Sequence, residues 1–240
     1  MAGWLKTILK SANPSPSTNG PANPQEKREG TYWPQFFEAD DLEAAKGIAI
    51  TPEEGMSTDE RWRSETAFMM EHIASRLAIG PKNVLIDFGC GVGRMSRALI
   101  ERYDCTVVGV DQSAKMREHA QSYVGSSRFK AASPAEFDTM VKEGFVADFG
   151  MAIWVLQHCV HPAGEISRIA NALAAEAPFL LVNSVHRLIP THLGWGQDGE
   201  NLDARMAERF GQLERMQFPE STSVKALREN SVISWWQRRV

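Results

Sequence analysis

The sequence predicts an α/β fold in which helices cover both faces of a parallel sheet. Three observations support this prediction. Strand-like and helical segments alternate from Val84 onward, the strands are nearly continuous apolar runs, and a glycine-rich turn follows the first strand. Alternation at this pace is typical of parallel β-α-β units. Continuous apolar strands indicate that both faces of the sheet are buried.

The composition is that of a globular protein with no strong charge bias. The 240 residues suffice for one domain with a sizeable core, and the net charge is -4. The chain has no surplus of basic residues that would indicate a nucleic-acid partner. No apolar run reaches the roughly 18 to 20 residues that a membrane span needs. Cys90, Cys105 and Cys159 are too far apart for a metal-ligand pattern, and their odd number excludes a full disulfide framework. We therefore expect a cytoplasmic protein without a metal site.

Two segments precede the first strand. Residues 1–30 are predicted to form a flexible leader, because residues 11–30 are rich in Pro, Asn, Ser and Gly. Residues 31–80 are predicted to form an N-terminal helical cap. Its main helix is expected between Thr58 and Leu77, after the capping-box residues Ser57 and Glu60. Residues 81–240 then form the main domain.

The main domain is predicted to run through strands and helices in turn. Strands are expected at 84–88, 106–110, 127–131, from 147 onward and at 179–185, with intervening helices at 93–103, 113–124, 134–142 and 162–175. Residues 187–201 form a long loop in this prediction. A helix at 202–210 and two final strands, at 212–218 and 231–239, complete the chain. Trp235 and Trp236 alternate across the last strand, so one of them should face the core.

The turn after the first strand is unusually rich in glycine. Gly89, Gly91 and Gly93 occupy every second position. Ligands of open parallel sheets bind beyond the carboxyl ends of the strands, and glycine lets a ligand pack directly on the main chain. The dinucleotide pattern GxGxxG would require a third glycine at position 94, which is Arg94. The observed GxGxG spacing suits a ligand that has no pyrophosphate.

The second strand ends in an acidic residue. Asp111 lies 22 positions after Gly89, at the end of "VVGVD". A carboxylate at this position accepts hydrogen bonds from both ribose hydroxyls of an adenosine. The alternative is that Asp111 caps the helix that follows.

Three segments, "VLIDFGCGVGR", "VVGVDQS" and "ADFGMAIWVLQHCVHP", resemble the class I S-adenosylmethionine (SAM)-dependent methyltransferases. The resemblance covers roughly residues 83–186, and the two final strands fit the antiparallel ending of that family. It implies a Rossmann-like, doubly wound, mostly parallel seven-stranded sheet with SAM as the cofactor.

The resemblance also implies roles for individual residues. Many members carry an acid at the end of the third strand that holds the adenine amino group; here Ser133, the main chain or Glu136 must serve. The implied cofactor-binding residues are Asp87, Gly89, Cys90 and Gly91 at the methionine part, Asp111 at the ribose, Gln112, Met116 and Ser133 at the adenine, and Ile153 and Trp154 beside the sulfonium.

Several further residues are candidates for catalysis or substrate binding. His158 is either a general base for a hydroxyl acceptor or a residue that positions the reactants. His186 and Arg187 follow the fifth strand and are candidates for substrate contacts. Trp195, in the long loop, either lines the acceptor pocket or packs on the core. Arg63 either pairs with the SAM carboxylate or is solvated.

These observations predict methyl transfer to an oxygen or nitrogen of a small-molecule acceptor, such as a metabolite, a sugar or a natural-product intermediate. Oxygen is preferred because His158 is available as a base. The chain has neither the Asn/Asp-Pro-Pro-Tyr motif of nucleic-acid amino methyltransferases nor a Pro-Cys nucleophile. Two alternatives stay open: a non-catalytic methyltransferase-fold subunit of a partner enzyme and, less favoured because of Arg94, an NAD-dependent oxidoreductase.

Overall fold

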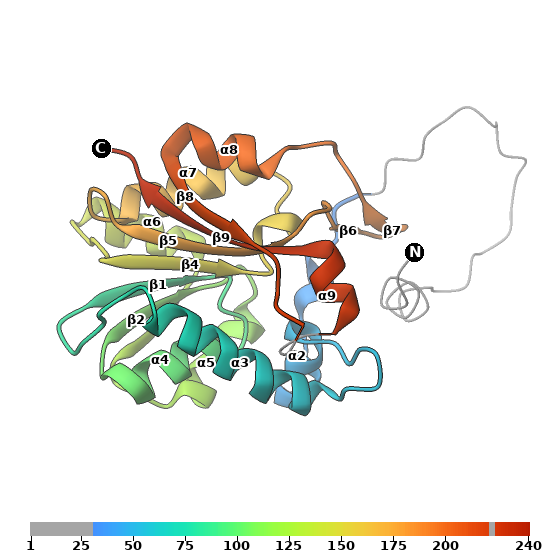
Figure 1. Cartoon of the computed structure of the whole chain (residues 1–240). Helices are drawn as coiled ribbons and strands as arrows, with labels where there is room; N and C mark the ends of the chain where they lie inside the picture. Colours follow the sequence, from blue (N-terminus) through green and yellow to red (C-terminus); the bar gives the residue numbers. More distant parts are fainter. Residues whose placement is uncertain (1–30, 221–223) are drawn as a thin grey trace, which may run out of the picture.

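The computed structural model describes residues 31–220 and 224–240, and it has a seven-stranded sheet between two layers of helices (Figure 1). The predicted leader, residues 1–30, lies outside the described residues. The strands of the sheet are β1 (Val84–Phe88), β2 (Thr106–Val110), β3 (Phe129–Ala132), β4 (Phe149–Ile153), β5 (Pro178–Ser184), β8 (Phe210–Met216) and β9 (Ser231–Arg238).

The strand order is β3-β2-β1-β4-β5-β9-β8. The first five strands are parallel, and β9 runs antiparallel to both β5 and β8. The order reverses between β1 and β4, which creates the crevice where doubly wound sheets bind their ligands. This topology confirms the predicted doubly wound, mostly parallel seven-stranded sheet.

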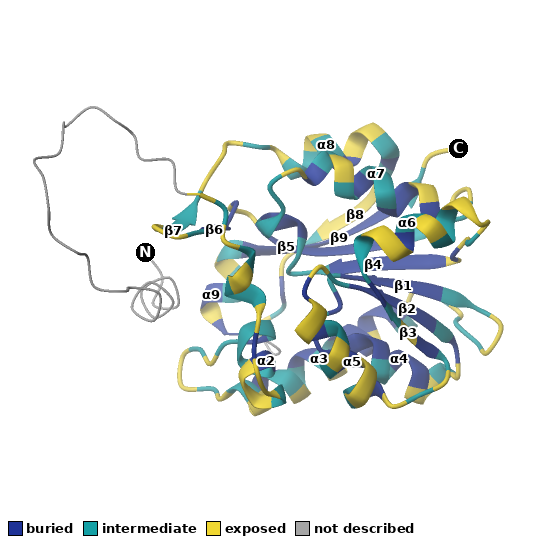
Figure 2. Ribbon diagram, turned by 180° about the vertical axis from the view of Figure 1, so that it is seen from behind, coloured by how far each residue is buried: buried dark blue, intermediate teal, exposed yellow. Residues whose placement is uncertain are grey.

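The two faces of the sheet have separate hydrophobic cores. One core contains Leu85 and Val107 and is covered by helices α3 (Thr58–Ala74), α4 (Arg94–Tyr103) and α5 (Ala114–Val124). The other contains Ile86 and Val108 and is covered by α6 (Pro134–Lys142), α7 (Pro162–Ala172) and α8 (Leu202–Arg209). Neighbouring residues of one strand thus enter opposite cores, as the two-residue period of a strand requires. The central strands are therefore buried on both sides (Figure 2).

Trp235 and Trp236 show the same alternation. Trp235 joins the core under α3, and Trp236 joins the core under α7 and α8. Both are buried, with 3% and 1% of their surface exposed. The sequence predicts that one of the two faces the core, but both do, because helices cover both faces.

Helix α3 begins where the sequence predicts. Ser57 is its N-cap, and Ser57 and Glu60 form the expected capping box. Met69, Met70 and Ile73 of α3 pack in the core with β1. The rest of the predicted cap, which contains η1 (Pro34–Phe37) and α2 (Leu42–Ala49), lies near the carboxyl ends of the parallel strands (Figure 1).

The predicted long loop at 187–201 contains a hairpin instead. Strands β6 (Ile189–Thr191) and β7 (Gly194–Gly196) pair in antiparallel fashion. The start of the described chain pairs with this hairpin, through a bridge between Tyr32 and Thr191 and a 2.9 Å hydrogen bond from the Trp33 amide to the Pro190 carbonyl. The remaining short helices are η2 (Leu156–His158) and α9 (Lys225–Asn230).

We predict that Ile73→Ala lowers the free energy of unfolding by about 2–5 kcal/mol, because Ile73 is fully buried between α3 and the sheet. Urea denaturation measures this change. Leu213→Ala on the edge strand β8 is the control; its side chain is 60% exposed, so the expected change is within about 0.5 kcal/mol. Equal effects of the two substitutions would contradict the packing of α3 on the sheet.

Candidate active site

A cavity of about 570 Å³ lies beyond the carboxyl ends of β1, β2 and β4. Its volume falls within the roughly 300–1,000 Å³ typical of small-molecule sites. It lies at the switch in strand order, as the sequence predicts for the ligand. Nine of the ten predicted cofactor-binding residues line it: Asp87, Gly89, Cys90, Gly91, Asp111, Gln112, Met116, Ile153 and Trp154.

The glycine turn forms the floor of this cavity, and its glycines serve different purposes. At Gly89, with φ +72°, a Cβ atom would lie 2.2 Å from a methyl group of Val155, so protein packing excludes a side chain there. At Gly91, with φ +52°, a Cβ atom would have no protein atom within 4 Å. Since Gly91 lines the cavity, a Cβ atom there would occupy space that a ligand can use.

Asp111 connects the glycine turn with the end of β2. One carboxylate oxygen accepts from the Gly91 amide and the other from the Ser113 amide, both at 2.9 Å. A carboxylate has about four acceptor positions, so each oxygen can accept a further hydrogen bond. Burial raises the pKa of Asp111, while the two amide hydrogen bonds oppose that rise. Ser113, rather than Asp111, is the N-cap of α5. Asp111 therefore has the position and the free acceptor capacity to bind two ribose hydroxyls.

A second acidic group, Asp87, and one basic group, Arg94, also line the cavity near the glycine turn. Asp87 is buried and accepts a 2.7 Å hydrogen bond from the Ser96 hydroxyl; burial raises its pKa to about 6. Arg94, the first residue of α4, donates to Thr66 Oγ1 at 2.9 Å and lies 5.7 Å from the Trp62 ring centroid. Among the described residues that line the cavity, Arg94 is the only Arg or Lys. Together these groups fit the ammonium and carboxylate of an amino acid.

Sequence reasoning used Arg94 only as an argument against a dinucleotide and missed its place in the cavity. The available signal was its position: an arginine that opens the helix after a glycine turn combines its own charge with the positive helix end. Arg63, for which the sequence leaves open a pair with the SAM carboxylate or a solvated position, is exposed.

The structure does not support the adenine role predicted for Ser133. The Ser133 hydroxyl accepts from the Glu136 amide, and the Glu136 carboxylate accepts from the Ser133 amide at 2.7 Å. This reciprocal capping box starts α6 and keeps both side chains occupied. Neither residue lines the cavity, whereas the adjacent Pro134 does.

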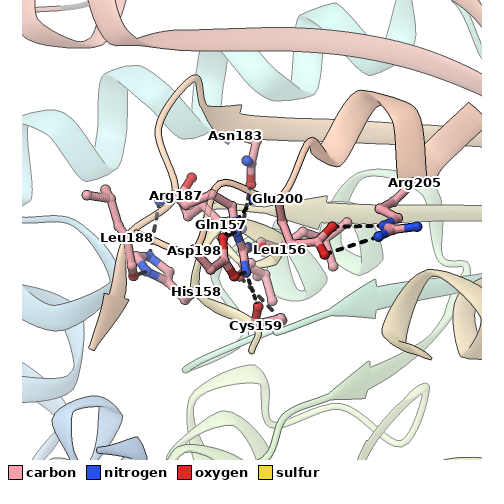
Figure 3. A network of polar contacts seen from close by, with 11 residues as sticks. Leu156, Gln157, His158, Cys159, Asn183, Arg187, Leu188, Asp198, Glu200 and Arg205 are labelled. Atoms are coloured by element: carbon pink, nitrogen blue, oxygen red, sulfur yellow. Dashed lines mark hydrogen bonds and ion pairs between the residues drawn. The ribbon is translucent and has the colours of Figure 1, made fainter. Parts of the chain in front are cut away.

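His158 lines the cavity but has both ring nitrogens engaged (Figure 3). Nδ1 lies 2.5 Å from the Leu188 carbonyl oxygen, which can only accept, so Nδ1 carries the proton. Nε2 then accepts from the Gln157 amide nitrogen at 3.1 Å, and Gln157 Oε1 accepts from the Ser184 amide. Burial lowers the pKa of His158 to about 4, although the hydrogen bond to Leu188 opposes this. The geometry thus supports the positioning role rather than the general-base role.

Arg187 and His186 do not reach either cavity described here. Arg187 is buried; it pairs with Asp198 at 2.9 Å and donates to the carbonyls of Leu156 and Cys159 (Figure 3). It therefore fixes the segment that carries His158. His186 is exposed. The predicted substrate contacts of Arg187 and His186 are not supported.

A second cavity, of about 350 Å³, adjoins the first. Trp195, one of the predicted substrate residues, lines it. Trp154, at the end of β4, has φ +64°, a strained conformation for a bulky residue and one that often marks a functional site. Five residues line both cavities and so form their shared wall: Phe37, Ile48, Ala49, Trp154 and His158.

The first described residues, 31–38, contact the residues of both cavities. The Tyr32 hydroxyl accepts from the Gln112 amide at 3.0 Å beside the cofactor cavity. The rings of Phe37 and His158 lie 5.1 Å apart, and those of Phe36 and Trp195 lie 4.7 Å apart. The sequence assigns these aromatic residues only to the N-terminal cap at 31–80 and does not reveal their place in the site.

The described residues contain neither a metal-binding cluster nor a membrane-spanning helix. No group of three or more His, Cys, Asp or Glu residues is arranged to hold a metal ion within residues 31–220 and 224–240. No helix in the same ranges has the length and apolar character to cross a membrane.

The sequence and the fold match known methyltransferases. Residues 59–239 match the model of a methyltransferase domain family, and the chain belongs to this family. Over 106 residues it is 26% identical to the sterol 24-C-methyltransferase of Debaryomyces hansenii, covering 43% of this chain and 28% of that protein. The chain therefore aligns with little more than a quarter of its curated relative.

Solved structures show the same fold. Geranyl diphosphate methyltransferase, in complex with GPP and sinefungin, gives a TM-score of 0.57 at 14% identity, over 76% of this chain and 79% of that one. The cyclopropane synthase MmaA2 of Mycobacterium tuberculosis gives a TM-score of 0.56 at 15% identity, over 78% of this chain and 87% of that one. The fold is that of the class I SAM-dependent methyltransferases, and SAM is the cofactor that this family and this cavity assign.

We predict that Gly91→Ala weakens binding of S-adenosylhomocysteine by at least about tenfold, since its Cβ atom would project into the cofactor cavity. Calorimetry measures the affinity. Gly125→Ala is the matched control, because Gly125 has φ +59° at the end of α5, outside the cavity. Both substitutions carry a backbone penalty of about 1–2 kcal/mol, but only Gly91→Ala should change affinity. If both variants bind S-adenosylhomocysteine with the same affinity, the ligand does not lie against Gly91.

We predict that Arg94→Met weakens the binding of S-adenosylhomocysteine by at least about tenfold. The affinity for 5′-methylthioadenosine should change by less than about threefold, because this compound lacks the amino-acid end. Arg94→Lys, which keeps the positive charge, should fall between wild type and Arg94→Met. Equal losses for both compounds would show that Arg94 does not pair with the carboxylate.

Proposed function

We propose that this protein transfers a methyl group from SAM to an oxygen or nitrogen of a small-molecule acceptor. The observation that carries the proposal is the wall shared by the two cavities at Trp154 and His158. When bound, SAM supplies an electrophilic methyl group on a sulfur that is already a good leaving group. The protein then has to hold the acceptor atom, the methyl carbon and the sulfur in line, which is catalysis by positioning.

The hydrogen bonds of His158 favour nitrogen over oxygen as the methylated atom. A hydroxyl acceptor gains from a general base, and the Nε2 lone pair of His158 already accepts from Gln157. A neutral amine attacks through its own lone pair and needs no base before the transfer. The sequence-based preference for oxygen depended on His158, so an oxygen acceptor is now the second candidate.

Two further observations support a mostly hydrophobic acceptor. The second cavity is lined by apolar and aromatic side chains such as Phe36, Ile50, Leu188 and Leu227. The names of the relatives include a sterol and geranyl diphosphate, whose skeletons are largely hydrocarbon.

The cofactor cavity also bears on the other sequence-based alternatives. A non-catalytic subunit has no need for Asp111, Gly91 and Arg94 to surround one open space at the switch point, as they do here. An NAD-dependent oxidoreductase would need room for the pyrophosphate of its cofactor at the start of α4. Arg94 occupies that position, where the dinucleotide pattern has its third glycine.

The test is a methyl-transfer screen with labelled SAM against fractionated small-molecule extracts, with product masses read by mass spectrometry. We expect a product 14 mass units heavier than its acceptor and stoichiometric S-adenosylhomocysteine, because a hydrogen is replaced by methyl. Asp111→Asn is the control: it keeps one oxygen acceptor but loses the charge, and turnover at limiting SAM should fall by at least about tenfold. Tight binding of NADH without binding of SAM would contradict the proposal.

A further inference from the structure

We propose that the second cavity is the acceptor site and that it binds an amine carried on an apolar body. The inference rests on the proposed methyl transfer and names its substrate class. Its basis is an aromatic chamber, defined here as the part of the second cavity bounded by Phe36, Phe37, Trp154, His158 and Trp195.

Segments far apart in the sequence supply the aromatic rings of this chamber. Phe36 and Phe37 come from η1, His158 from η2 and Trp195 from β7. The rings contact one another in a chain, with centroid distances of 5.3 Å from Phe37 to Phe36, 4.7 Å from Phe36 to Trp195 and 5.5 Å from Trp195 to His158. Aromatic rings attract a cation within about 6 Å of their centroids, most strongly when water is excluded.

The basic side chains that line the second cavity do not oppose a cation. Arg61 is neutralised by Glu65 at 2.8 Å, and the side chains of this pair are 6% and 4% exposed. His158 is neutral because burial lowers its pKa to about 4. An anionic acceptor would therefore meet no uncompensated positive side chain among the described lining residues.

The reaction of an amine suits these surroundings at each stage. The neutral form of the amine is the one that reacts, because its lone pair is the nucleophile. This lone pair forms the new N–C bond to the methyl carbon while the C–S bond breaks and its electron pair stays on sulfur. Positive charge thereby moves from the sulfonium to the acceptor nitrogen, where the aromatic rings stabilise it. A primary or secondary amine afterwards releases a proton to water.

The test uses benzyltrimethylammonium, which mimics a methylated cationic product, and benzyl alcohol as its uncharged counterpart. Both are titrated by calorimetry into protein saturated with S-adenosylhomocysteine, so that no sulfonium charge repels the probe. We expect the cation to bind at least about tenfold more tightly than the alcohol.

Variants at the hairpin then locate the site. Trp195→Ala should weaken binding of the cation by at least about tenfold. Trp195→Phe keeps an aromatic ring and should weaken binding by less than about threefold. Leu193→Ala is the matched control; it lies in the turn between β6 and β7, is 55% exposed and lines neither cavity. S-adenosylhomocysteine affinity should stay unchanged in all three variants, which also shows that they are folded.

Three outcomes would overturn the inference and leave the proposed function standing: no binding of the cation to the loaded wild-type protein, no preference over benzyl alcohol, or a Trp195→Ala variant that binds the cation as wild type does. Failure of wild-type protein to bind S-adenosylhomocysteine would instead overturn the proposed function, and this inference with it.

Discussion

The attachment of the glycine turn to the end of β2 determines the geometry of the whole site. The amides of Gly89 and Cys90 lie 2.6 and 3.1 Å from the Val110 carbonyl, and the Gly91 amide donates to Asp111. These hydrogen bonds join the turn after one strand to the tip of its neighbour. As a result, bare backbone and a carboxylate face the same open space. This arrangement offers main-chain surface and a hydrogen-bond acceptor to a ligand that carries a sugar and a short amino-acid arm.

A second set of polar contacts fixes the wall that the two cavities share at His158. Arg187 binds the carbonyls on either side of the His158 segment, and Asp198 neutralises its charge. His158 is held in turn by Leu188 and Gln157. A buried, fully paired network of this kind is rigid, because an unpaired charge in the interior would be costly. The wall between the two cavities is thereby fixed, and a transfer reaction that relies on alignment needs such a wall.

The sequence predicts the sheet and the cofactor side of the site well, because local patterns determine both. Apolar runs define the strands, and the glycine spacing with Asp111 defines the first cavity. The acceptor side depends on contacts between distant segments, such as Tyr32 with Gln112 and Phe36 with Trp195, which no local pattern reveals. Arg187 was predicted to contact substrate because it follows the fifth strand. Its burial and its pairing with Asp198 depend on tertiary structure, so the sequence does not reveal them. The capping role of Ser133, by contrast, was readable, since Ser133 and Glu136 have the same spacing as Ser57 and Glu60.

The central claim is that the adenosyl ligand lies on the glycine turn with its ribose on Asp111. A crystal structure of the protein with S-adenosylhomocysteine tests it most directly. The account predicts both ribose hydroxyls within about 2.5–3.0 Å of the Asp111 carboxylate oxygens, with the amino-acid arm between Asp87 and Arg94. A ligand bound elsewhere, or a ribose without contact to Asp111, would contradict the account.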